Sequence, residues 1–450
     1  MAFAGRRAAG VAQRARGKSA AEVNLDIQLR TAQHIFEVLG ELKGCAAKLG
    51  QLLALYELAL PPELAEPYRI ALGQLQDSAP TMMPASVHAA MAAEMGASWR
   101  RHFKEFDDRR AAGASIGQVH HAVWRDGRQV AVKVMYPGAH QAVLGDLEQL
   151  RRLSILATVF VPGADVPAVT EAVCTSVADE LDYAAEAEHQ RVFAEAFADD
   201  PDFVVPQVIT QRGDVIVSEW LHGTPVTRII ESGTREERSR VGMLILRFLL
   251  SSWVRTGLLY CDPHPGNFRV LPDGRLGVVD FGACVAWPQD GFTGLVIEVV
   301  EAALNGTVAD LDAALRRHGF VEPGRSYDAE AIAEGIVVVS EPLAQNSFHF
   351  TNDWLRRRVR YVMDPRLSNA HRQMTIPAYV TPFARALLTA MGVLCALDTD
   401  GPVRGEFARW FPPLAASFER YDNHRSQPTD LGLVRQLRAD KPRRRFSVVI

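Results

Sequence analysis

Hydrophobic residues first recur in a regular pattern near the start of the chain. Between Ile35 and Tyr56 they return every three or four positions, which predicts an amphipathic helix. The helix should end near the LPPE of residues 60–63, because two consecutive prolines cannot continue it. The pattern therefore predicts a helical segment ahead of the first strands.

A strand pattern replaces the helical one after residue 110. Small residues at 111–115 are followed by VHHAVW, the turn RDGR and QVAVKVM. Asp126-Gly127 lies between the two β-rich runs, which favours a β-hairpin, and we expect the small residues before it to form a loop. FVVPQVI and DVIVSEWL predict two further strands, joined by a turn at Arg212-Gly213.

The second half of the chain has mainly helical periodicity. Residues 171–200 contain no glycine or proline and are rich in alanine and glutamate, which predicts one long helix. After HGTPV at 222–226 only FRVL and LGVVDF, on either side of Pro272-Asp273-Gly274, indicate strands. A strand-rich half followed by a helix-rich half predicts an α+β fold with two lobes, and 450 residues suffice for several domains.

Composition narrows the class of protein. Hydrophobic residues make up 48% and charged residues 23%, as in soluble proteins, and the net charge of -4 gives no reason to expect nucleic acid as a partner. Five scattered cysteines without a CxxC spacing argue against a zinc site or a disulfide framework and favour a reducing compartment. No apolar run reaches the ~20 residues of a membrane span. We expect a cytoplasmic or peripheral membrane protein.

The chain ends are basic. The first twenty residues carry five arginines and lysines with no acid before Glu22, and KPRRRF follows at 441–446. An organelle-targeting peptide, a basic surface-binding arm and a solvated terminus all fit the first segment, and these interpretations stay open.

The densest chemistry lies in DPHPGN at 262–267. Asp262 and Asn267 lie five residues apart, and Asp280 follows thirteen residues after the asparagine. Carboxylate and amide oxygens are ligands that Mg²⁺ accepts beside water and phosphate oxygens, so Asn267 and Asp280 could hold a metal on nucleotide phosphates. Asp262 could then orient or deprotonate an attacking hydroxyl or water.

Lys133, in VAVKV, supplies a candidate cation for those phosphates. The motifs follow one another in the order of the protein-kinase signature. They are a small-residue loop, a strand lysine, a helix with glutamates, D-x4-N and DFG. Glu219 to Leu221 should then form the connection between the lobes, whose backbone meets the adenine ring. Histidines are not expected to bind metal, because adjacent His120 and His121 point to opposite faces of a strand. His264 should instead brace the catalytic loop.

Several longer segments resemble the UbiB (AarF/UbiB) family of atypical kinases over roughly residues 30–400. They are KLGQ (48–51), LPPE (60–63), LQD (75–77), AAGASIGQVHHA (111–122), ELDYAAEAEHQ (180–190) and DPHPGN. The resemblance implies a two-lobed, kinase-like fold with a helical N-terminal extension packed over the active site. It also implies ATP and Mg²⁺ binding, slow ATPase activity, and a supporting role in the biosynthesis of an isoprenoid quinone, either ubiquinone or a menaquinone-like lipid.

The same resemblance assigns further residues to the site. In this family an alanine-rich loop replaces the glycine-rich one, so Ala112, Gly113, Ala114 and Ser115 are expected at the nucleotide, and alanine should stiffen the loop. Gly113 interrupts the alanines and departs from that pattern. Lys48 and Gln51, which share a face of the first helix, are implied to project into the cleft and to block a protein substrate.

Two glutamates are candidates to pair with the two lysines. Glu180 and Glu186 lie six positions apart, about 120° apart around a helix axis. We favour Glu186 for Lys133 and Glu180 for Lys48, and the reverse pairing stays open. The residues expected to be catalytic are Asp262, Lys133, Glu186, Glu180, Lys48 and Gln51, and those expected to bind the nucleotide are Ala112, Gly113, Ala114, Ser115, Lys133, Glu219, Leu221, Asn267 and Asp280.

The expected domain organisation follows from these motifs. It comprises a basic N-terminus (1–24), a helical extension with the KxGQ motif (25–108), a kinase-like N-lobe (109–221), a C-lobe (222–400) and a C-terminal tail (401–450). Unlike well-known UbiB members, the tail contains no membrane-spanning segment, so any membrane contact should be peripheral. The expected partners are ATP and an isoprenoid lipid or quinone precursor.

Two other functions remain open. One is a binding or complex-assembly module that nucleotide switches with little turnover. The other is a small-molecule phosphotransferase, since such kinases share a D-x4-N loop followed by an acid. KLGQ and ASIGQVH disfavour the phosphotransferase.

Overall fold

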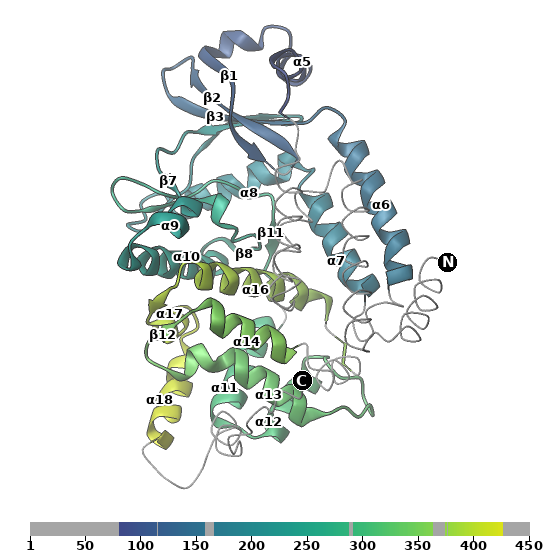
Figure 1. Ribbon diagram of the computed structural model, residues 1–450, viewed down its shortest axis with the longest axis vertical. Helices are drawn as coiled ribbons and strands as arrows, with labels where there is room; N and C mark the ends of the chain where they lie inside the picture. The colour runs from purple at the N-terminus through teal and green to yellow at the C-terminus, as the bar shows by residue number, and fades with distance from the viewer. Residues whose placement is uncertain are drawn as a thin grey trace, which may run out of the picture.

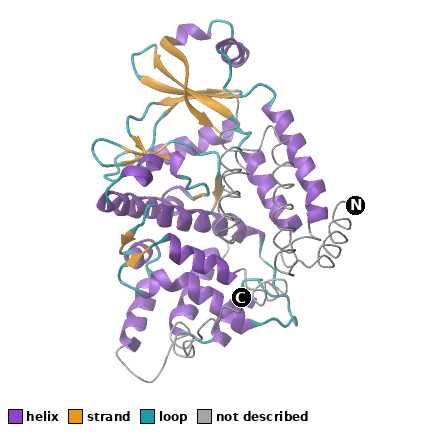
Figure 2. Cartoon of the chain, in the orientation of Figure 1, coloured by secondary structure: helices purple, strands orange, loops and turns teal. Residues whose placement is uncertain are grey.

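The computed structural model describes residues 81–114, 116–157, 166–287, 291–362, 374–375 and 377–425. The expected helix over 35–56, with Lys48 and Gln51, lies outside the described residues, as do Ser115 and both basic ends. Strands gather in the upper part of the molecule and helices fill the lower part (Figure 1, Figure 2). The two-lobed α+β fold expected from the sequence is confirmed.

The upper lobe is built on a five-stranded antiparallel sheet in the order β1-β2-β3-β6-β5. Its strands are β1 (Phe103–Ala114), β2 (Gly117–Trp124), β3 (Gln129–Met135), β5 (Val208–Arg212) and β6 (Val215–Glu219). One face packs against α5 (Pro84–Met95) and the 3₁₀ turn η1 (Trp99–His102) through buried Met91, Trp99 and Val132. The predicted hairpin is thus present, with its turn at Asp126-Gly127.

The small-residue stretch is not a loop, which corrects the expectation for residues 111–114. These residues form the end of β1, where Gly113 pairs with Gln118 and Ala114 with Gly117. Residues 103–114 carry six charged side chains and no β-branched residue, so their propensity does not predict a strand. Pairing with β2 along a largely exposed edge makes them a strand.

The long helix predicted over 171–200 is in fact two helices. α7 (Val166–Asp179) pairs with α6 (Ala139–Ala157) on one side of the molecule (Figure 1), and α8 (Tyr183–Ala196) runs beneath the sheet. The break needs no glycine or proline, because the Asp182 side chain accepts a hydrogen bond from the backbone N–H of Ala185 and caps α8. Glu180 therefore lies in the turn before α8, not on the same helix as Glu186.

The lower lobe is organised around α10 (Arg235–Thr256), which is capped at its start by Thr234 and at its end by Gly257 in the left-handed conformation. A four-stranded sheet in the order β4-β10-β9-β7 lies between α10 and the upper lobe. Its strands are β4 (Phe203–Val204), β7 (Thr224–Pro225), β9 (Phe268–Val270) and β10 (Leu276–Val278). The other elements are β8 (Leu258–Tyr260), β11 (Cys284–Ala286), β12 (Phe348–His349), β13 (Asp400–Gly401), α9 (Val226–Ser232), α11 (Phe292–Asn305), α12 (Val308–Arg317), α13 (Ala329–Ser340), α14 (Asn352–Val362), α16 (Thr381–Ala396), α17 (Val403–Trp410), α18 (Pro413–Arg425) and the 3₁₀ turns η2 (Pro265–Asn267), η3 (Glu341–Ala344) and η4 (Ala378–Val380).

The first part of the expected C-terminal tail belongs to the lower lobe. α17 packs on α10 and α18 on α11, and Phe411, Leu414 and Phe418 are buried in the same core as Phe292 of α11. The lobe therefore extends to at least residue 425, past the boundary at 400 that we expected from the sequence.

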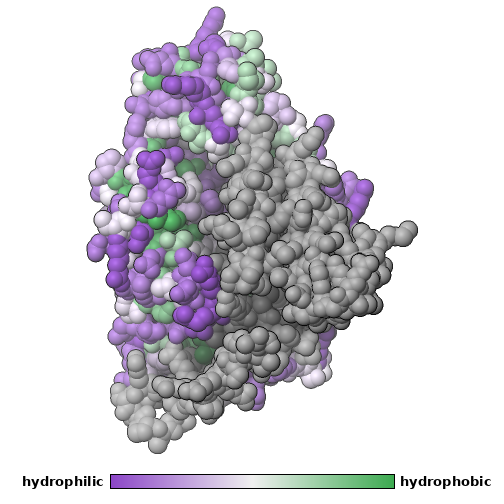
Figure 3. Space-filling model, in the orientation of Figure 1, coloured by the Kyte–Doolittle hydropathy of each residue, from purple (hydrophilic) through white to green (hydrophobic). Residues whose placement is uncertain are grey.

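In the described part of the chain no helix combines the length and the apolar character needed to cross a bilayer. Among the described residues the large exposed hydrophobic side chains are Met83, just before α5, and Leu144, Val254 and Leu388, which lie on α6, α10 and α16. On the face drawn in Figure 3, hydrophilic and hydrophobic residues are interspersed over the described surface.

Candidate functional site

Lys133 lies where the two lobes meet. Alternation along β3 buries Val132 and Val134 against α5 and turns Lys133 to the opposite face. Its Nζ is 2.6 Å from Oε1 of Glu186 on α8 and 3.1 Å from Oδ2 of Asp280 after β10. Three elements distant in sequence thus converge on one ammonium group, and the pairing favoured for Glu186 is the one observed.

The charges of this cluster set its protonation. Burial lowers the pKa of Lys133, but the neighbouring carboxylates of Asp280 and Glu186 outweigh burial and raise that pKa well above its ordinary value. Burial raises the pKa of Glu186 to about 7 against the opposing charge of Lys133. Lys133 therefore stays an ammonium at neutral pH, which suits a group that binds phosphate.

Tyr183 completes the surroundings of Lys133. Its ring lies 5.1 Å from the Lys133 ammonium, and a Cβ on Gly117 would lie 2.8 Å from its hydroxyl oxygen. Tyr183 thus fits between Lys133 and Gly117 at the start of β2. The sequence reasoning missed it, although its position one helical turn before Glu186 places both side chains on one face of α8.

The catalytic loop and Asp280 are held together by backbone hydrogen bonds. β8, which precedes the loop, pairs with β11, which follows Asp280. The N–H of Cys261 donates to Ala283 O at 2.8 Å, and the N–H of Val279 donates to Asn267 O at 3.0 Å. Both ends of the DPHPGN segment are therefore anchored to the DFG segment, so Asp262, Asn267 and Asp280 have a fixed relation.

Side chains within the loop reinforce this arrangement. Asn267 donates through Nδ2 to the backbone oxygen of Asp262 at 3.0 Å. His264 accepts a hydrogen bond from the N–H of Gly266 at 3.2 Å, so it braces the loop as expected. Because Nδ2 donates to the loop, the carbonyl oxygen of Asn267 is the atom that could face a cation.

The acidic residues converge around Gly282. A Cβ on this glycine would lie 3.5 Å from Asp280 Oδ1, 3.6 Å from Glu186 Oε2 and 3.7 Å from Cγ of Glu180. The turn before α8 thus brings Glu180 to the same cluster. Lys48, the partner expected for Glu180, lies outside the described residues.

The oxygen ligands fit Mg²⁺ bound to a nucleotide. Among the described residues no group of three or more His, Cys, Asp or Glu side chains could form a complete metal site. Asn267 and Asp280 offer two hard oxygen ligands, and the Asp280 side chain is 32% exposed. Mg²⁺ commonly takes one or two protein ligands and completes its octahedron with water and phosphate oxygens, so the donor set suits the nucleotide complex.

The connection between the lobes follows β6. Glu219 lies on the face of the sheet opposite to Lys133, because Ile216 is the residue of β6 that pairs with Lys133. Its carboxylate lies 3.4 Å from Arg128 and 3.2 Å from the N–H of Gln207. Leu221 passes over β10, where a Cβ on Gly277 would lie only 2.7 Å from its Cδ1. Of the small residues expected at the nucleotide, Ala112 and Ala114 are partly exposed and Gly113 is exposed at the end of β1.

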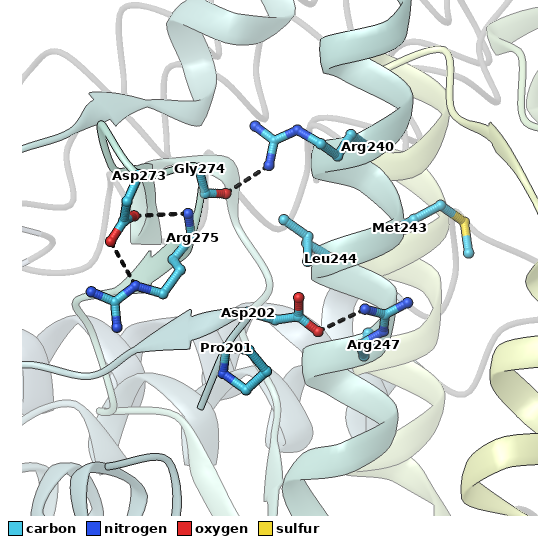
Figure 4. A pocket seen from close by; sticks show the side chains of 9 residues that line it. All are labelled: Pro201, Asp202, Arg240, Met243, Leu244, Arg247, Asp273, Gly274 and Arg275. Atoms are coloured by element: carbon cyan, nitrogen blue, oxygen red, sulfur yellow. Dashed lines mark hydrogen bonds and ion pairs between the residues drawn. The ribbon is translucent and has the colours of Figure 1, made fainter. Parts of the chain in front are cut away.

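A separate pocket lies on another part of the lower lobe. A cavity of about 350 Å³ lies between α10 and the β9–β10 turn. Figure 4 shows that Arg240, Arg247 and Arg275 are among the residues around it. Arg247 pairs with Asp202, Arg275 with Asp273, and Arg240 donates to the backbone oxygen of Gly274. The cavity shares no lining residue with the Lys133 cluster, and its arginines already have partners.

Comparison with protein families identifies one match. Residues 74–312 match the ABC1 atypical kinase-like domain. The chain is similar to the mitochondrial atypical kinase coq-8 of Caenorhabditis elegans, with 29% identity over 366 residues, covering 79% of this chain and 47% of the relative. It is 32% identical over 287 residues to the chloroplastic protein Activity of BC1 Complex Kinase 3 of Arabidopsis thaliana, covering 62% of this chain and 39% of that protein. The chain therefore spans about half or less of the length of these relatives.

A solved structure covers more of the chain. Rv3197 of Mycobacterium tuberculosis, in a complex with erythromycin, is 36% identical, and the match covers 88% of this chain and 100% of that chain with a TM-score of 0.64. The similarity therefore includes both lobes described above.

Proposed function

We propose that this chain, which belongs to the ABC1 family of atypical kinase-like proteins, also called the UbiB family, binds Mg·ATP between its lobes and turns it over. The observation that carries the proposal is the bridge from Lys133 to both Glu186 and Asp280. It joins the upper sheet, α8 and the DFG segment, as phosphoryl transfer by kinases requires.

The chain's own residues have distinct roles in this proposal. Lys133, oriented by Glu186, holds the α and β phosphates. Asn267 and Asp280 hold the metal, which would neutralise charge on the phosphates when bound. Asp262, fixed by the loop, accepts the proton of the attacking water or hydroxyl as the bond to the γ-phosphorus forms and ADP leaves.

The wider role that we propose is support of isoprenoid quinone biosynthesis, with an isoprenoid lipid or quinone precursor as partner. It rests on family membership and on relatives named as mitochondrial atypical kinases and as a chloroplastic BC1 complex kinase. Membrane contact would be peripheral.

A second candidate is a module that binds a bulky ligand and is switched by nucleotide with little turnover. The observation that favours it is the erythromycin complex of the 36% identical Rv3197. Erythromycin is a large macrolide, so a related chain accommodates a bulky ligand.

Phosphate release tests the first proposal. We would measure Mg²⁺-dependent release from ATP by the full chain, alone, with liposomes containing a quinone precursor, and with erythromycin. Asp262→Asn should abolish release but keep nucleotide binding, and Asp280→Asn should lose most Mg·ATP affinity. Asp273→Asn is the matched control, because Asp273 lies on the β9–β10 turn and pairs with Arg275.

The outcomes separate the two candidates. Release that rises with the lipid and disappears in Asp262→Asn supports lipid-coupled turnover. ATP binding without release, together with erythromycin binding that depends on nucleotide, favours the switched module. Unchanged Mg·ATP affinity in Asp280→Asn would refute the assignment of the site.

A further inference from the structure

Lys133 identifies which face of the upper sheet borders the cleft. In the antiparallel register Lys133 lies opposite Val119, and Ala131 lies opposite His121. Residues two apart on a strand, and residues directly opposite each other, share a face. His121 and Ala131 therefore face the same side as Lys133, further along the cleft towards the connection between the lobes.

Trp220 of that connection contacts both lobes. Its ring centroid is 4.9 Å from that of His121, with the two planes nearly perpendicular at 81°. The guanidinium carbon of Arg269 lies 6.0 Å from the same Trp220 ring centroid. His121, Trp220 and Arg269 thus form a continuous row from β2 to β9.

Arg269 belongs to the upper face of the lower lobe. It lies opposite Gly277 and Pro225 in the β9 register, so it shares the face of the hairpin over which Leu221 packs. Phe268, its neighbour, points the other way into the core. Arg269 therefore lies on the lower-lobe side of the connection between the lobes, whereas His121 and Ala131 lie on the upper-lobe side.

The guanidinium of Arg269 is a partly buried cation whose interactions are weak. It donates through one terminal nitrogen to Gly223 O at 3.3 Å, and within the described part of the chain it forms no ion pair with a carboxylate. Burial lowers its pKa. A desolvated guanidinium is stabilised by an aromatic plane, because it stacks on π-systems and is weakly hydrated.

We propose that Arg269 is a base-binding residue, which stacks its guanidinium plane on the nucleotide base while Trp220 closes the outer end of the cleft. The inference rests on the proposed binding of Mg·ATP and deepens it. It assigns base affinity to the Arg269 end of the cleft and phosphate affinity to the Lys133 end.

The two ends can be tested separately with two ligands. Mg·ATP has a base, whereas Mg·tripolyphosphate has only the phosphate chain. By the usual effect of removing a stacking side chain, Arg269→Ala should weaken Mg·ATP by about 5- to 50-fold and leave Mg·tripolyphosphate unchanged. Arg269→Lys should stay at least about 5-fold weaker, because a point charge lacks the planar fork.

Two controls make the comparison specific. Arg275→Ala removes another arginine of the same hairpin, one that pairs with Asp273 on the side of the separate pocket, and it should bind both ligands as the unchanged chain does. Thermal unfolding of each variant checks folding. The intrinsic fluorescence should change on adding Mg·ATP but not Mg·tripolyphosphate, and Trp220→Phe should reduce that change.

Three results would overturn the role of Arg269. The first is an equal loss of affinity for both ligands in Arg269→Ala and Arg269→Lys, and the second is no loss of Mg·ATP affinity in Arg269→Ala. The third is full Mg·ATP affinity in Arg269→Lys. Failure of the proposed function is recognisably different. In that case the unchanged chain binds neither ligand, or Asp280→Asn alters neither.

Discussion

Replacing Glu186 with glutamine should change how stability depends on pH. The carboxyl group is 3% exposed, and burial raises its pKa from 4.5 to about 7. The folded chain therefore holds this proton more tightly than the unfolded chain does. The resulting stability is fully present below pH 4.5 and is lost as the pH rises through 7. A shift of this size corresponds to roughly 3 kcal/mol.

Glutamine keeps an oxygen for Lys133 but does not titrate. We therefore compare the free energies of unfolding of the unchanged chain and of Glu186→Gln. The difference, unchanged chain minus variant, should fall by roughly 3 kcal/mol between about pH 4.5 and 8. Urea denaturation of both proteins at four pH values across this range, without nucleotide, measures the difference. The effects of other titrating groups largely cancel, because both chains contain them.

Glu171→Gln is the control. The hydrogen bond from Arg151 lowers the pKa of Glu171 from its usual 4.5, so the stability that this carboxylate contributes is nearly complete above about pH 5.5 and does not fall between there and pH 8. Its substitution should therefore shift stability almost equally over that range. Parallel pH profiles for the unchanged chain and Glu186→Gln would refute the argument that burial governs Glu186.

Two further substitutions test packing at the site and an ion pair elsewhere in the core. Gly117→Ala should destabilise the chain by about 1–3 kcal/mol, because the new Cβ would lie 2.4 Å from a backbone oxygen of β3 and 2.8 Å from the Tyr183 hydroxyl. Gly113→Ala is its control and should be close to neutral in urea denaturation, because its Cβ meets only an arginine side chain at 3.7 Å. Arg255→Ala should cost about 1.5–3 kcal/mol, because it removes the ion-pair partner of the Asp200 carboxylate, which is 5% exposed and keeps its hydrogen bonds from the N–H groups of Asp202 and Phe203. A loss below about 1 kcal/mol, the value of an exposed pair, would contradict the second prediction.

The local elements of the site could be predicted because each depends on a short segment. The β2–β3 hairpin follows from a turn between two β-rich runs, and Lys133 on β3 follows from alternation. D-x4-N and DFG lie beside each other because the strands on either side of them pair. The sequence favours the pairing of Glu186 with Lys133 but does not decide it, since two glutamates are available; the contact in the structure does.

Long-range contacts explain what could not be predicted. β1 is a strand because β2 offers it an edge, not because residues 103–114 favour extended structure. The helix break at Asp182 depends on one hydrogen bond, from the N–H of Ala185 to the Asp182 side chain. This cap and a continuous helix differ little in free energy, so the sequence pattern does not distinguish them. Arg269 and Trp220 meet only once the two lobes are assembled, so no local pattern distinguishes them from other surface residues.

The burial of Phe281 has a consequence for inhibitor chemistry. This residue of the DFG segment is fully buried, and its ring lies 5.0 Å from that of Phe193 and 5.9 Å from that of Tyr260. Compounds that act by displacing this phenylalanine would have to empty an aromatic core, at a cost comparable to the ~3–5 kcal/mol of deleting a buried phenylalanine. Selective ligands for this chain should therefore be sought among molecules that occupy the base end of the cleft and leave Phe281 in place.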